Sequence, residues 1–442
     1  MAEPTPTVSD ITKVALASLV GTTIEYFDFF IAATTAATVW GPLFFPTASA
    51  ASGLLLAFGV YGVGFASRPI GSFFFGHFGD KIGRRTVLVW TLITTGIGTL
   101  GMAVSPSYAA AGVLGGVVLT IFRFIQGLGL GGEWGGASTW VTEFASKSKH
   151  RSFWAGWIAA GVPFGLISAD AVILTLESIY PHSVFVTTGW RIAFVIGAAV
   201  ILMGALLRYK LTESPIFRKM IDQSSTARAP ASEVLRRYIG RILLLAGSTA
   251  IITAGGYTEQ AFTIGYLASR GISPAFTTLA VMIGASVGFF ALIGGSVLAD
   301  RVGRRHVIIL GASSTLVFAY PFFMLLNTGN HLLIILAMAV ATALLWTGFG
   351  PFAAFLAEQF PTRYRFSGSG LSYQISTPFA GGLAPIIASS FLVAYGHGAA
   401  PYVAAELIAY SLLTIICTSM ARETKGSDID VIGEQAGTPT RE

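Results

Sequence analysis

The chain alternates long apolar runs with short polar connections along most of its length. Each run is about 20 residues long, enough for a helix to cross the ~30 Å hydrocarbon core of a bilayer. A membrane β-barrel would instead show segments of ~10 residues with alternating hydrophobicity. The pattern predicts an all-α membrane protein with twelve transmembrane helices. They begin near Val14, Ser52, Thr86, Ala109, Ser152, Gly189, Arg241, Pro274, His306, His331, Phe366 and Ala400.

The longest polar segment, residues 208–241, divides these runs into two sets of six. We therefore predict an N-terminal six-helix bundle over residues 1–209 and a C-terminal one over 241–422. A cytoplasmic central loop is expected at 210–240. The polar residues 423–442 are predicted to form a disordered cytoplasmic tail.

A charged cluster occurs twice, as "GDKIGRR" at residues 79–85 and as "ADRVGRR" at 299–305. Each copy connects the second and third helix of its own half. Each half also ends its fourth helix with a glutamate before a basic connection, Glu143 and Glu358. Features that recur in the same order indicate a duplicated six-helix unit. Two such units, with a substrate site between them near mid-membrane, form the architecture of many secondary transporters.

The composition narrows the class of protein further. Charged residues are 11% of the chain and hydrophobic residues 53%, whereas about a quarter of an ordinary soluble domain is charged. The single cysteine, Cys417, excludes an intrachain disulfide and the usual zinc and iron–sulfur spacings. No phosphate-binding "GxxxxGK[ST]" motif is present. We therefore predict no cofactor, no metal and no enzymatic activity, with transport driven by the proton gradient.

Lysine and arginine gather in the connections on one side of the predicted membrane, with Arg270 as the clearest exception. Such residues mark the cytoplasmic side of multi-pass proteins. Both termini are therefore predicted to be cytoplasmic, in a plasma or inner membrane. The basic residues do not form one footprint, which argues against binding of nucleic acid. The basic residues that indicate the cytoplasmic side are those of the central loop together with Lys81, Arg84, Arg85, Lys147, Lys149, Arg151, Arg301, Arg304, Arg305, Arg363 and Arg365.

The duplicated cluster resembles the signature of the major facilitator superfamily, G-x-x-x-D-[RK]-x-G-[RK]-[RK]. The first copy matches throughout, and the second has Ser296 in place of the leading glycine. The resemblance implies two pseudo-symmetric bundles whose cytoplasmic charges gate the transition between states; the alternative is that the basic residues only anchor the loops. The matching residues are Gly76, Asp80, Lys81, Gly83, Arg84, Arg85, Asp300, Arg301, Gly303, Arg304 and Arg305.

Within that superfamily the chain is most similar to the metabolite:proton symporters. The matching stretches include "GTTIEYFDFFIAATTA", "RFIQGLGLGGEWGGAS" and "SGSGLSYQISTPFAGG". The resemblance implies proton-coupled uptake of organic acids, aromatic carboxylates or zwitterionic osmolytes. The short tail lacks the heptad coiled coil of osmosensing members, which argues against an osmosensor.

Asp28 and Arg123 are expected at compatible depths. At ~1.5 Å per residue, Asp28 lies about 20 Å into the first helix and Arg123 about 16–20 Å into the fourth. Ionisable residues inside the bilayer are costly and are often functional. We predict that the two form a pair whose protonation and separation couple proton movement to transport. The alternative is a permanent ion pair that braces the two helices.

Arg68 lies inside the second helix, beside Pro69 and with no acidic neighbour on its own helix. A guanidinium fork suits bidentate binding of a carboxylate. Arg68 is therefore predicted to bind the substrate anion, and pairing with Glu25 is the alternative. Glu25 is three residues before Asp28 and shares a helix face with it, so it is included in the substrate site.

Other polar residues in the apolar runs receive less specific predictions. Glu133 is assigned to the gate, in a relay with Arg84 or Arg85, and Glu143 joins it there. Glu259 is a candidate ligand for a cationic group, or a residue that faces water at the outer end. Further predicted cavity residues, for which ordinary packing is the alternative, are Tyr257, Tyr266, Trp346, Tyr373 and Gln374.

These residues predict a proton-coupled symporter that imports a small carboxylated metabolite by alternating access. The alternatives are a proton-driven exporter and a uniporter of the same fold. Exporters are expected to carry G-x-x-x-G-P-x-x-G-G in the fifth helix, and Val162 interrupts that motif in "GWIAAGVPFGL". The chain shows no nucleophile elbow or metal-ligand constellation that would indicate a membrane enzyme or sensor.

Overall fold

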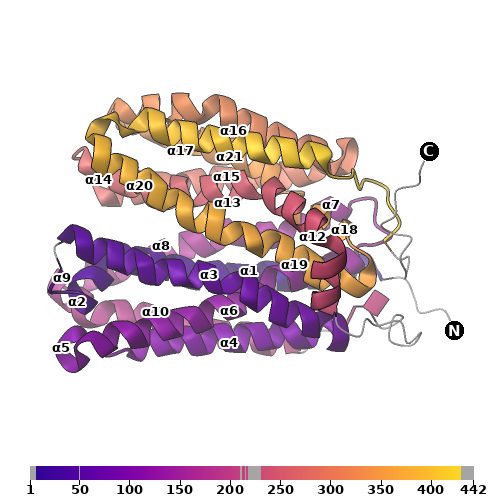
Figure 1. The fold of residues 1–442 in the computed structure, drawn as a ribbon, viewed down its shortest axis with the longest axis horizontal. Coiled ribbons are helices and arrows are strands. Elements are labelled where there is room, and N and C mark those ends of the chain that lie inside the picture. Colours follow the sequence, from indigo (N-terminus) through magenta and orange to yellow (C-terminus); the bar gives the residue numbers. More distant parts are fainter. Residues whose placement is uncertain (1–5, 49, 210–211, 215, 218–229, 430–442) are drawn as a thin grey trace.

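A computed structural model describes residues 6–48, 50–209, 212–214, 216–217 and 230–429 of the 442-residue chain. Two helical bundles lie side by side, one from each half of the sequence (Figure 1). The helices of both run along the long axis of the molecule. The described parts next to the two termini lie at the same end, together with α7, α12, α18 and α19.

The N-terminal bundle consists of six helical stretches. The long helices among them have mostly apolar surfaces and several buried small or polar positions. Their elements are α1 (Val8–Thr35), η1 (Ala36–Trp40), α2 (Gly41–Phe44), α3 (Ala50–Ile82), α4 (Arg84–Val104), α5 (Tyr108–Ala111), α6 (Val113–Phe144), α7 (Arg151–Ala159), α8 (Gly161–Ile179), α9 (His182–Val184), η2 (Phe185–Gly189) and α10 (Trp190–Tyr209).

The C-terminal bundle repeats this plan. Its elements are α12 (Pro230–Ser248), α13 (Ala250–Tyr257), η3 (Thr258–Phe262), α14 (Thr263–Ser269), α15 (Pro274–Val302), α16 (Arg304–Asn327), α17 (His331–Phe349), α18 (Phe352–Glu358), η4 (Thr362–Tyr364), α19 (Arg365–Ser376), η5 (Thr377–Gly382), α20 (Leu383–Tyr395), η6 (Gly396–Ala399) and α21 (Ala400–Met420). The π-helical turns η3 and η5 interrupt the seventh and eleventh stretches, and such turns are frequent at functional sites.

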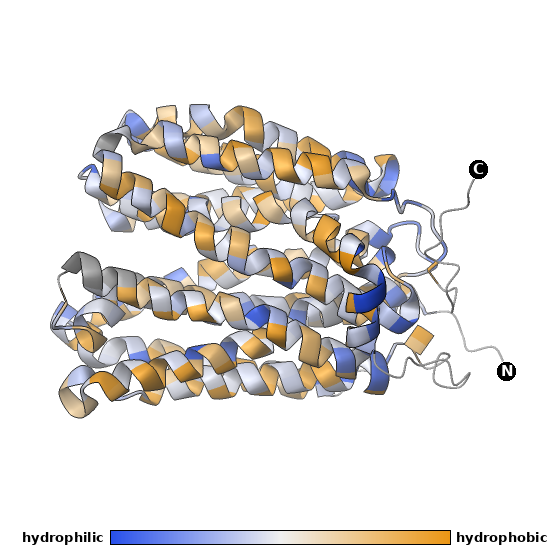
Figure 2. Ribbon diagram, in the orientation of Figure 1, coloured by the Kyte–Doolittle hydropathy of each residue, from blue (hydrophilic) through white to orange (hydrophobic). Residues whose placement is uncertain are grey.

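The predicted membrane helices are confirmed. Within the described ranges, eleven helical stretches are long and apolar enough to cross a bilayer. The second predicted span is α3, which is 33 residues long and therefore also long enough. Hydrophobic residues cover the lengths of both bundles, and hydrophilic residues gather at the end that holds α12 and α19 (Figure 2).

Two predicted boundaries change. The segment from Pro230 to 240 was predicted as loop, but it is helical, because α12 begins at Pro230 and is kinked at Tyr238. The rest of the predicted central loop lies largely outside the described residues (210–211, 215 and 218–229). In the predicted disordered tail, residues 423–429 have defined contacts with the bundles, described below, and residues 430–442 lie outside the described part of the chain.

The two bundles meet through equivalent helices. On one side α19 of the C-terminal half packs against α3 and α6, and on the other side α15 packs against α7 and α8. The second helix of each half therefore contacts a helix of the opposite half. This arrangement brings both charged clusters to the boundary between the bundles.

Candidate functional site

The two charged clusters fold in the same way, around glycines with positive φ. Gly83 has φ 122° and Gly303 has φ 111°, conformations that side-chain-bearing residues rarely adopt. Each glycine lets the second helix end and the third begin at once. A carboxylate from the end of the same half lies beside each glycine, Glu213 at Gly83 and Glu423 at Gly303.

These two carboxylates bind the exposed N-terminus of the third helix in their half. Glu213 accepts a hydrogen bond from the Arg85 N–H at 3.1 Å, and Glu423 accepts from Arg304 and Arg305 at 3.0 Å each. Burial raises the pKa of the Glu213 carboxyl. Burial also acts to raise the pKa of Glu423, but hydrogen bonds from backbone N–H groups outweigh it and lower the pKa.

The aspartate of each cluster binds a helix N-terminus of the opposite half. Asp80 accepts hydrogen bonds from Phe366 N at 3.1 Å and Ser367 N at 2.8 Å, in the first turn of α19. Asp300 accepts from Ser152 N and Phe153 N, both at 2.9 Å, in the first turn of α7. A carboxylate is favourable at this position because helix N-termini present unpaired N–H groups and a partial positive charge.

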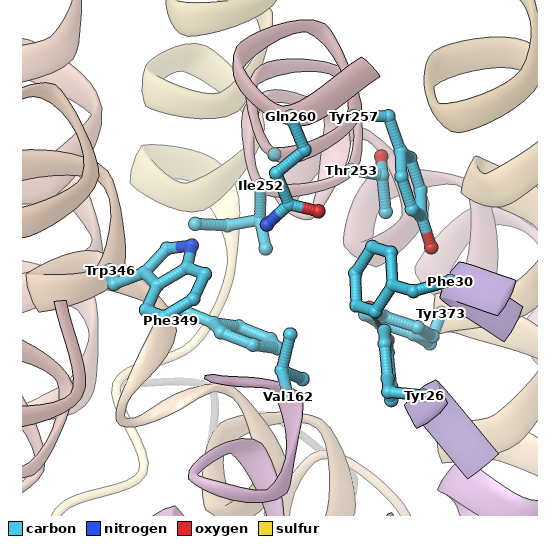
Figure 3. A pocket seen from close by; sticks show the side chains of 11 residues that line it. Tyr26, Phe30, Val162, Ile252, Thr253, Tyr257, Gln260, Trp346, Phe349 and Tyr373 are labelled. Carbon is cyan, nitrogen blue, oxygen red and sulfur yellow. Dashed lines mark hydrogen bonds between the residues drawn. The ribbon is translucent and has the colours of Figure 1, made fainter. Parts of the chain in front are cut away.

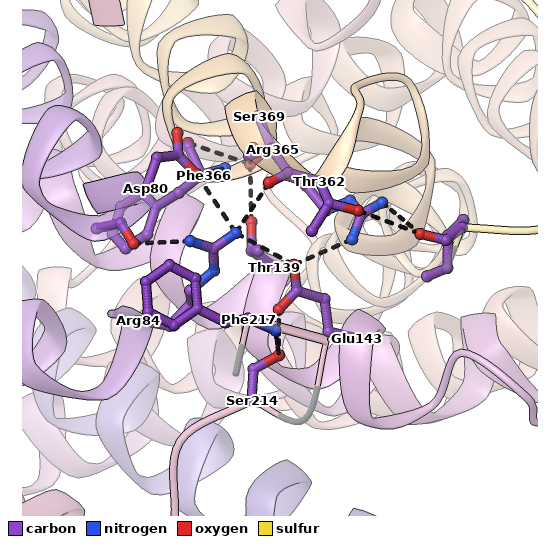
Figure 4. A network of polar contacts seen from close by, with 12 residues as sticks. Asp80, Arg84, Thr139, Glu143, Ser214, Phe217, Thr362, Arg365, Phe366 and Ser369 are labelled. Atoms are coloured by element: carbon purple, nitrogen blue, oxygen red, sulfur yellow. Dashed lines mark hydrogen bonds and ion pairs between the residues drawn. The ribbon is translucent and has the colours of Figure 1, made fainter. Parts of the chain in front are cut away.

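In each of the two clusters a glutamate also binds one arginine from either half. Glu143 contacts Arg84 of its own half at 3.3 Å and Arg365 of the other half at 3.0 Å (Figure 4). It also accepts a hydrogen bond from the Ser214 hydroxyl.

The second copy has the reciprocal arrangement. Glu358 contacts Arg304 of its own half at 3.2 Å and Arg151 of the other half at 2.9 Å. We call Asp80, Arg84, Glu143 and Arg365 the first latch. Asp300, Arg304, Glu358 and Arg151 form the second latch. Both lie at the end of the molecule that holds the termini, and with both formed the bundles are held together at that end.

The other predicted gating residues do not belong to the latches. Lys81 and Arg301 are exposed, and among the contacts of the described residues none joins their side chains to the opposite half. The Arg85 guanidinium lies over the Tyr209 ring, and Arg305 donates to the Ser419 carbonyl at 2.6 Å. These two contacts lie within a single half of the molecule.

The predicted relay between Glu133 and Arg84 or Arg85 is wrong. Glu133 instead pairs with Arg208, whose Nη1 donates to Oε2 at 2.6 Å, and it accepts from the Thr91 hydroxyl at 3.1 Å. Both charged residues are nearly inaccessible, at 2% and 1% exposure. Arg208 is in the last turn of α10 and reaches inward from there.

Asp28 and Arg123 are brought together, but not as the direct pair predicted. The side-chain amide of Gln126 lies between them: its NH₂ group donates to Asp28 and its carbonyl accepts from Arg123. The Thr99 hydroxyl donates to the same carboxylate at 2.7 Å. The chain Thr99–Asp28–Gln126–Arg123 therefore joins helices α4, α1 and α6 through one carboxylate.

Arg68 is 1% exposed, and its Nε and Nη2 atoms have no hydrogen-bond partner in the described structure. Its guanidinium lies 4.7 Å from the centre of the Phe29 ring and 5.2 Å from that of Phe65. The Oε2 atom of Glu25 is likewise buried without a partner. No Arg68–Glu25 ion pair is among the contacts of the described residues. The alternative prediction, that Arg68 pairs with Glu25, therefore does not hold in this conformation.

A central cavity lies between the halves, with a volume of about 30 Å³. Such a space holds about one or two water molecules. Aromatic rings form most of its wall, and the Gln260 amide points into it (Figure 3). It is lined by Tyr26, Phe30, Val162, Ile252, Thr253, Gly256, Tyr257, Gln260, Trp346, Phe349 and Tyr373.

Three of the predicted cavity residues, Tyr257, Trp346 and Tyr373, line this space. The Tyr373 and Tyr26 hydroxyls are 3.4 Å apart across the boundary between the halves. Arg68 and Glu25 are not in the lining. Tyr257 lies between Arg68 and the cavity. Its ring packs on the rings of Phe29 and Phe65, and these two rings also contact Arg68.

Three predicted cavity residues serve other contacts. Tyr266 donates to Asn327 and stacks on Phe262, and the Gln374 amide donates to the Leu130 carbonyl at 3.2 Å. Glu259 neither lines the cavity nor faces water: it is 3% exposed and accepts from Thr342 at 3.2 Å. Its neighbour Gln260 occupies the cavity wall instead, because consecutive residues of a helix point in different directions.

Four residues of these networks were not assigned such roles from the sequence. Gln126 carries no charge and so attracted no attention in an apolar helix, although "RFIQG" contains it. Arg208, Arg151 and Arg365 stand at helix ends, where a basic residue usually marks only the cytoplasmic side. Each of these three arginines pairs with a buried acid, but that pairing becomes visible only when the helices are placed in three dimensions.

Comparison with known proteins identifies the family. Residues 18–385 match the model of the Major Facilitator Superfamily. The inner membrane metabolite transport protein YhjE of Escherichia coli (strain K12) is 34% identical over 430 residues, covering 96% of each chain. The shikimate transporter of the same organism is 31% identical over 431 residues, covering 96% of this chain and 97% of that protein.

A similar fold is present in the solved structure of the proton:xylose symporter XylE bound to 6-bromo-6-deoxy-D-glucose. The TM-score is 0.76 at 17% sequence identity, with 96% of this chain and 98% of the other covered. The twelve helices, the duplicated latches and the central cavity fit this relationship. The chain therefore belongs to the major facilitator superfamily, and it is a multi-pass membrane transporter of metabolites rather than an enzyme.

Proposed function

We propose that the protein is a proton-coupled symporter that imports a small carboxylated metabolite across the plasma membrane. The observation that carries this proposal is the buried Arg68 guanidinium, which has two unpartnered nitrogens one aromatic layer from the central cavity. A buried guanidinium without a full set of acceptors is costly. A substrate carboxylate that enters from the cavity would supply two oxygens in the geometry that the guanidinium fork prefers.

Rearrangement of the aromatic layer is needed for this contact. The cavity is too small for an organic acid in this conformation, and the Tyr257 ring packs on Phe29 and Phe65 beside Arg68. Binding would therefore move these rings and enlarge the cavity. The latches suit alternating access, because they close one end of the molecule through bonds that a rotation of the halves would break.

Proton coupling is assigned to the Thr99–Asp28–Gln126–Arg123 chain. The Gln126 amide donates a hydrogen bond to the Asp28 carboxylate and accepts one from the Arg123 guanidinium. Protonation of Asp28 removes the negative charge that strengthens the first bond, so the amide is held less firmly in this position. Protonation at one end of the chain then changes the partners of Arg123, which lies over the Tyr61 and Phe29 rings. Phe29 also contacts Arg68, so the two arginines share one ring.

The proposed orientation places both latches in the cytoplasm. The basic residues of the connections are concentrated at this end, as expected for a cytoplasmic side. In this orientation the structure is closed toward the cytoplasm. The similarity to a shikimate transporter and, in fold, to a proton:xylose symporter supports small-molecule symport.

The test is uptake into proteoliposomes across an imposed pH gradient, with a panel of carboxylates that includes shikimate, matched neutral analogues, and zwitterions. We expect accumulation of at least one carboxylate that collapses with the gradient, and loss of its binding in Arg68→Ala. Uptake that does not depend on the pH gradient would indicate a uniporter. Efflux driven by the gradient would indicate an exporter. Retained carboxylate binding in Arg68→Ala rejects the ligand assignment.

Gln126→Leu separates coupling from binding. The substitution removes both hydrogen bonds of the amide, each to a charged group and so worth about 1.5–3 kcal/mol. Substrate exchange without a gradient should survive, while gradient-driven accumulation should fall. Equal loss of both activities would assign Gln126 to helix packing alone.

A further inference from the structure

A second cavity, of about 310 Å³, lies at the latch end of the C-terminal half, apart from the central cavity. Its wall combines the middle of α12, the connection between α18 and α19, and the described part of the tail. The lining residues that matter here are Arg241, Gln359, Arg365, Arg422, Thr424 and Ser427. Nothing in the proposed transport mechanism uses this space.

The tail forms one wall of the cavity and is tied to both halves. Gln359 donates to the Arg422 carbonyl at 2.7 Å, and Arg365 donates to the Ile429 carbonyl at 2.9 Å. On the other side, Arg151 of the N-terminal half donates to the Ser427 carbonyl at 3.2 Å. The cavity therefore depends on the same arginines that form the two latches.

Positive charge dominates the cavity. Three arginines line it, Arg241, Arg365 and Arg422, against two acids, Glu358 and Asp428. The acids in the wall have partners elsewhere: Glu358 binds Arg151 and Arg304, and the exposed Asp428 lies 3.7 Å from Lys147. Such an excess of guanidinium groups around one space favours the binding of an anion, although the charge of Arg365 is already paired with Glu143.

Two buried donors in the wall are left unsatisfied. The Arg365 Nε and the Thr424 hydroxyl have no hydrogen-bond partner in the described structure, although these residues are only 1% and 2% exposed. Unsatisfied buried donors cost about 1–3 kcal/mol each. They belong to two different elements of the wall, α19 and the tail, so one ligand with several acceptor oxygens can serve both.

We propose that this cavity binds a phosphate group, carried either by a soluble phosphorylated metabolite or by a lipid headgroup. A tetrahedral oxyanion matches guanidinium and hydroxyl donors and offsets the excess of arginines in the wall. Because the walls are assembled by latch residues, the site exists fully only when the latches are closed. A ligand that binds one state better shifts the equilibrium toward it, so bound phosphate stabilises the closed latch end and slows transport. The compartment that supplies the ligand rests on the orientation given under the proposed function.

Binding is tested on the full-length protein in detergent, by calorimetry and melting temperature, with inorganic phosphate against chloride at equal ionic strength. A second arm uses nanodiscs of zwitterionic lipid with and without phosphatidic acid. Thr424→Val removes one hydroxyl at nearly constant shape, and Arg422→Gln removes an exposed charge. Lys425→Gln is the matched control, because Lys425 is also in the tail but is not in the cavity wall.

We expect phosphate to bind the wild type and Lys425→Gln equally, and to bind each of the other two variants about tenfold more weakly. If only phosphatidic acid stabilises the protein, with the same dependence on the variants, the ligand is a lipid headgroup. Absence of binding in both arms, or binding that ignores Thr424→Val and Arg422→Gln, overturns the proposal. The readout needs no transport, so failure of the symport assignment leaves this result interpretable.

Discussion

The two halves share one plan, yet they differ sharply in the charges buried inside their membrane helices. The N-terminal half holds a balanced set of three acids and three arginines, each no more than 3% exposed: Glu25, Asp28, Glu133, Arg68, Arg123 and Arg208. In the C-terminal half the apolar stretches contain the acids Glu259 and Glu406, and residues 242–269, 274–300, 306–357 and 366–421 contain no lysine or arginine. Neither of these acids has a basic partner among the described contacts.

The difference indicates a division of labour after duplication. Buried charges are tolerated when each has a partner, and the removal of one partner is expensive because the other charge stays buried. In the part of the chain that the structure describes, only Glu133 and Arg208 of this set pair directly. Arg68 and Glu25 keep atoms without a hydrogen-bond partner in the described structure, so under the proposed coupling they are available to change partners. The C-terminal half contributes neutral groups to the central cavity instead, such as Gln260 and Trp346.

The largest expected effect separates Asp28 from Glu259. In Asp28→Asn, gradient-driven accumulation should fall by at least tenfold, about 1.4 kcal/mol, because the amide holds no exchangeable charge for Arg123 to follow. Exchange of substrate without a gradient should persist. Proteoliposome uptake with and without an imposed pH gradient measures both. Glu259→Gln is the matched change in the other half, and if it abolishes coupling while Asp28→Asn does not, the division of labour is reversed.

Stability should show the same contrast. Glu133→Gln leaves the Arg208 charge buried without its partner, so we expect a loss of about 3–5 kcal/mol. Glu259→Gln removes an acid that has no basic partner and should cost about 1 kcal/mol or less. Melting curves in detergent compare the two. The double variant Glu133→Leu, Arg208→Met should recover most of the loss, and failure to recover would mean that packing, not charge, explains the single variant.

The latches, by contrast, should respond alike. Glu143→Gln and Glu358→Gln each weaken the hold on two arginines, with charge-assisted bonds worth about 1.5–3 kcal/mol. Each should raise the population with an open latch end about tenfold or more. Spin labels at Lys81→Cys and Arg301→Cys, in a Cys417→Ser background, report the distance between the halves. A shift in only one variant would show that the second latch is not equivalent to the first.

The smallest effect concerns the carboxylates that bind the third helix of each half. Glu423→Gln should cost about 0.3–1 kcal/mol at neutral pH. Because the pKa of Glu423 is lowered in the fold, its stabilisation is present above about pH 4.3 and lost as the pH falls through the folded value. Glu213 has a raised pKa, so its contribution improves as the pH falls. The melting temperatures of Glu423→Gln and Glu213→Gln, each relative to the wild type, should change in opposite directions as the pH falls from neutral to acidic values, and parallel curves would contradict the assignment.

The fold follows from the sequence because its signals are local. Apolar runs of membrane length and the two copies of the Asp-Gly-Arg cluster specify twelve helices and their internal symmetry. The start of α12 at Pro230 was missed because residues 230–240 are polar, and hydropathy detects only the part of a helix that meets lipid.

The site follows only in part, because partners are chosen in three dimensions. Asp28, Arg123 and Arg68 were predicted because a charged side chain in the bilayer has a high free energy, and the depth of each residue can be read from the sequence. The bridging residue Gln126 was not predicted because it is neutral, and the Arg208 partner of Glu133 was not predicted because it stands at a helix end. Adjacent residues also face different ways, so Gln260 enters the cavity and Glu259 does not.

The reciprocal latches have a consequence for how the transporter moves. Each glutamate and each aspartate reaches from one half to the other, and the two sets exchange roles between the halves. A rocking motion cannot release one set by degrees while the other stays intact, because the same rigid bodies carry both. If the halves rock as rigid bodies, we therefore expect opening at this end to be concerted, with few intermediate positions.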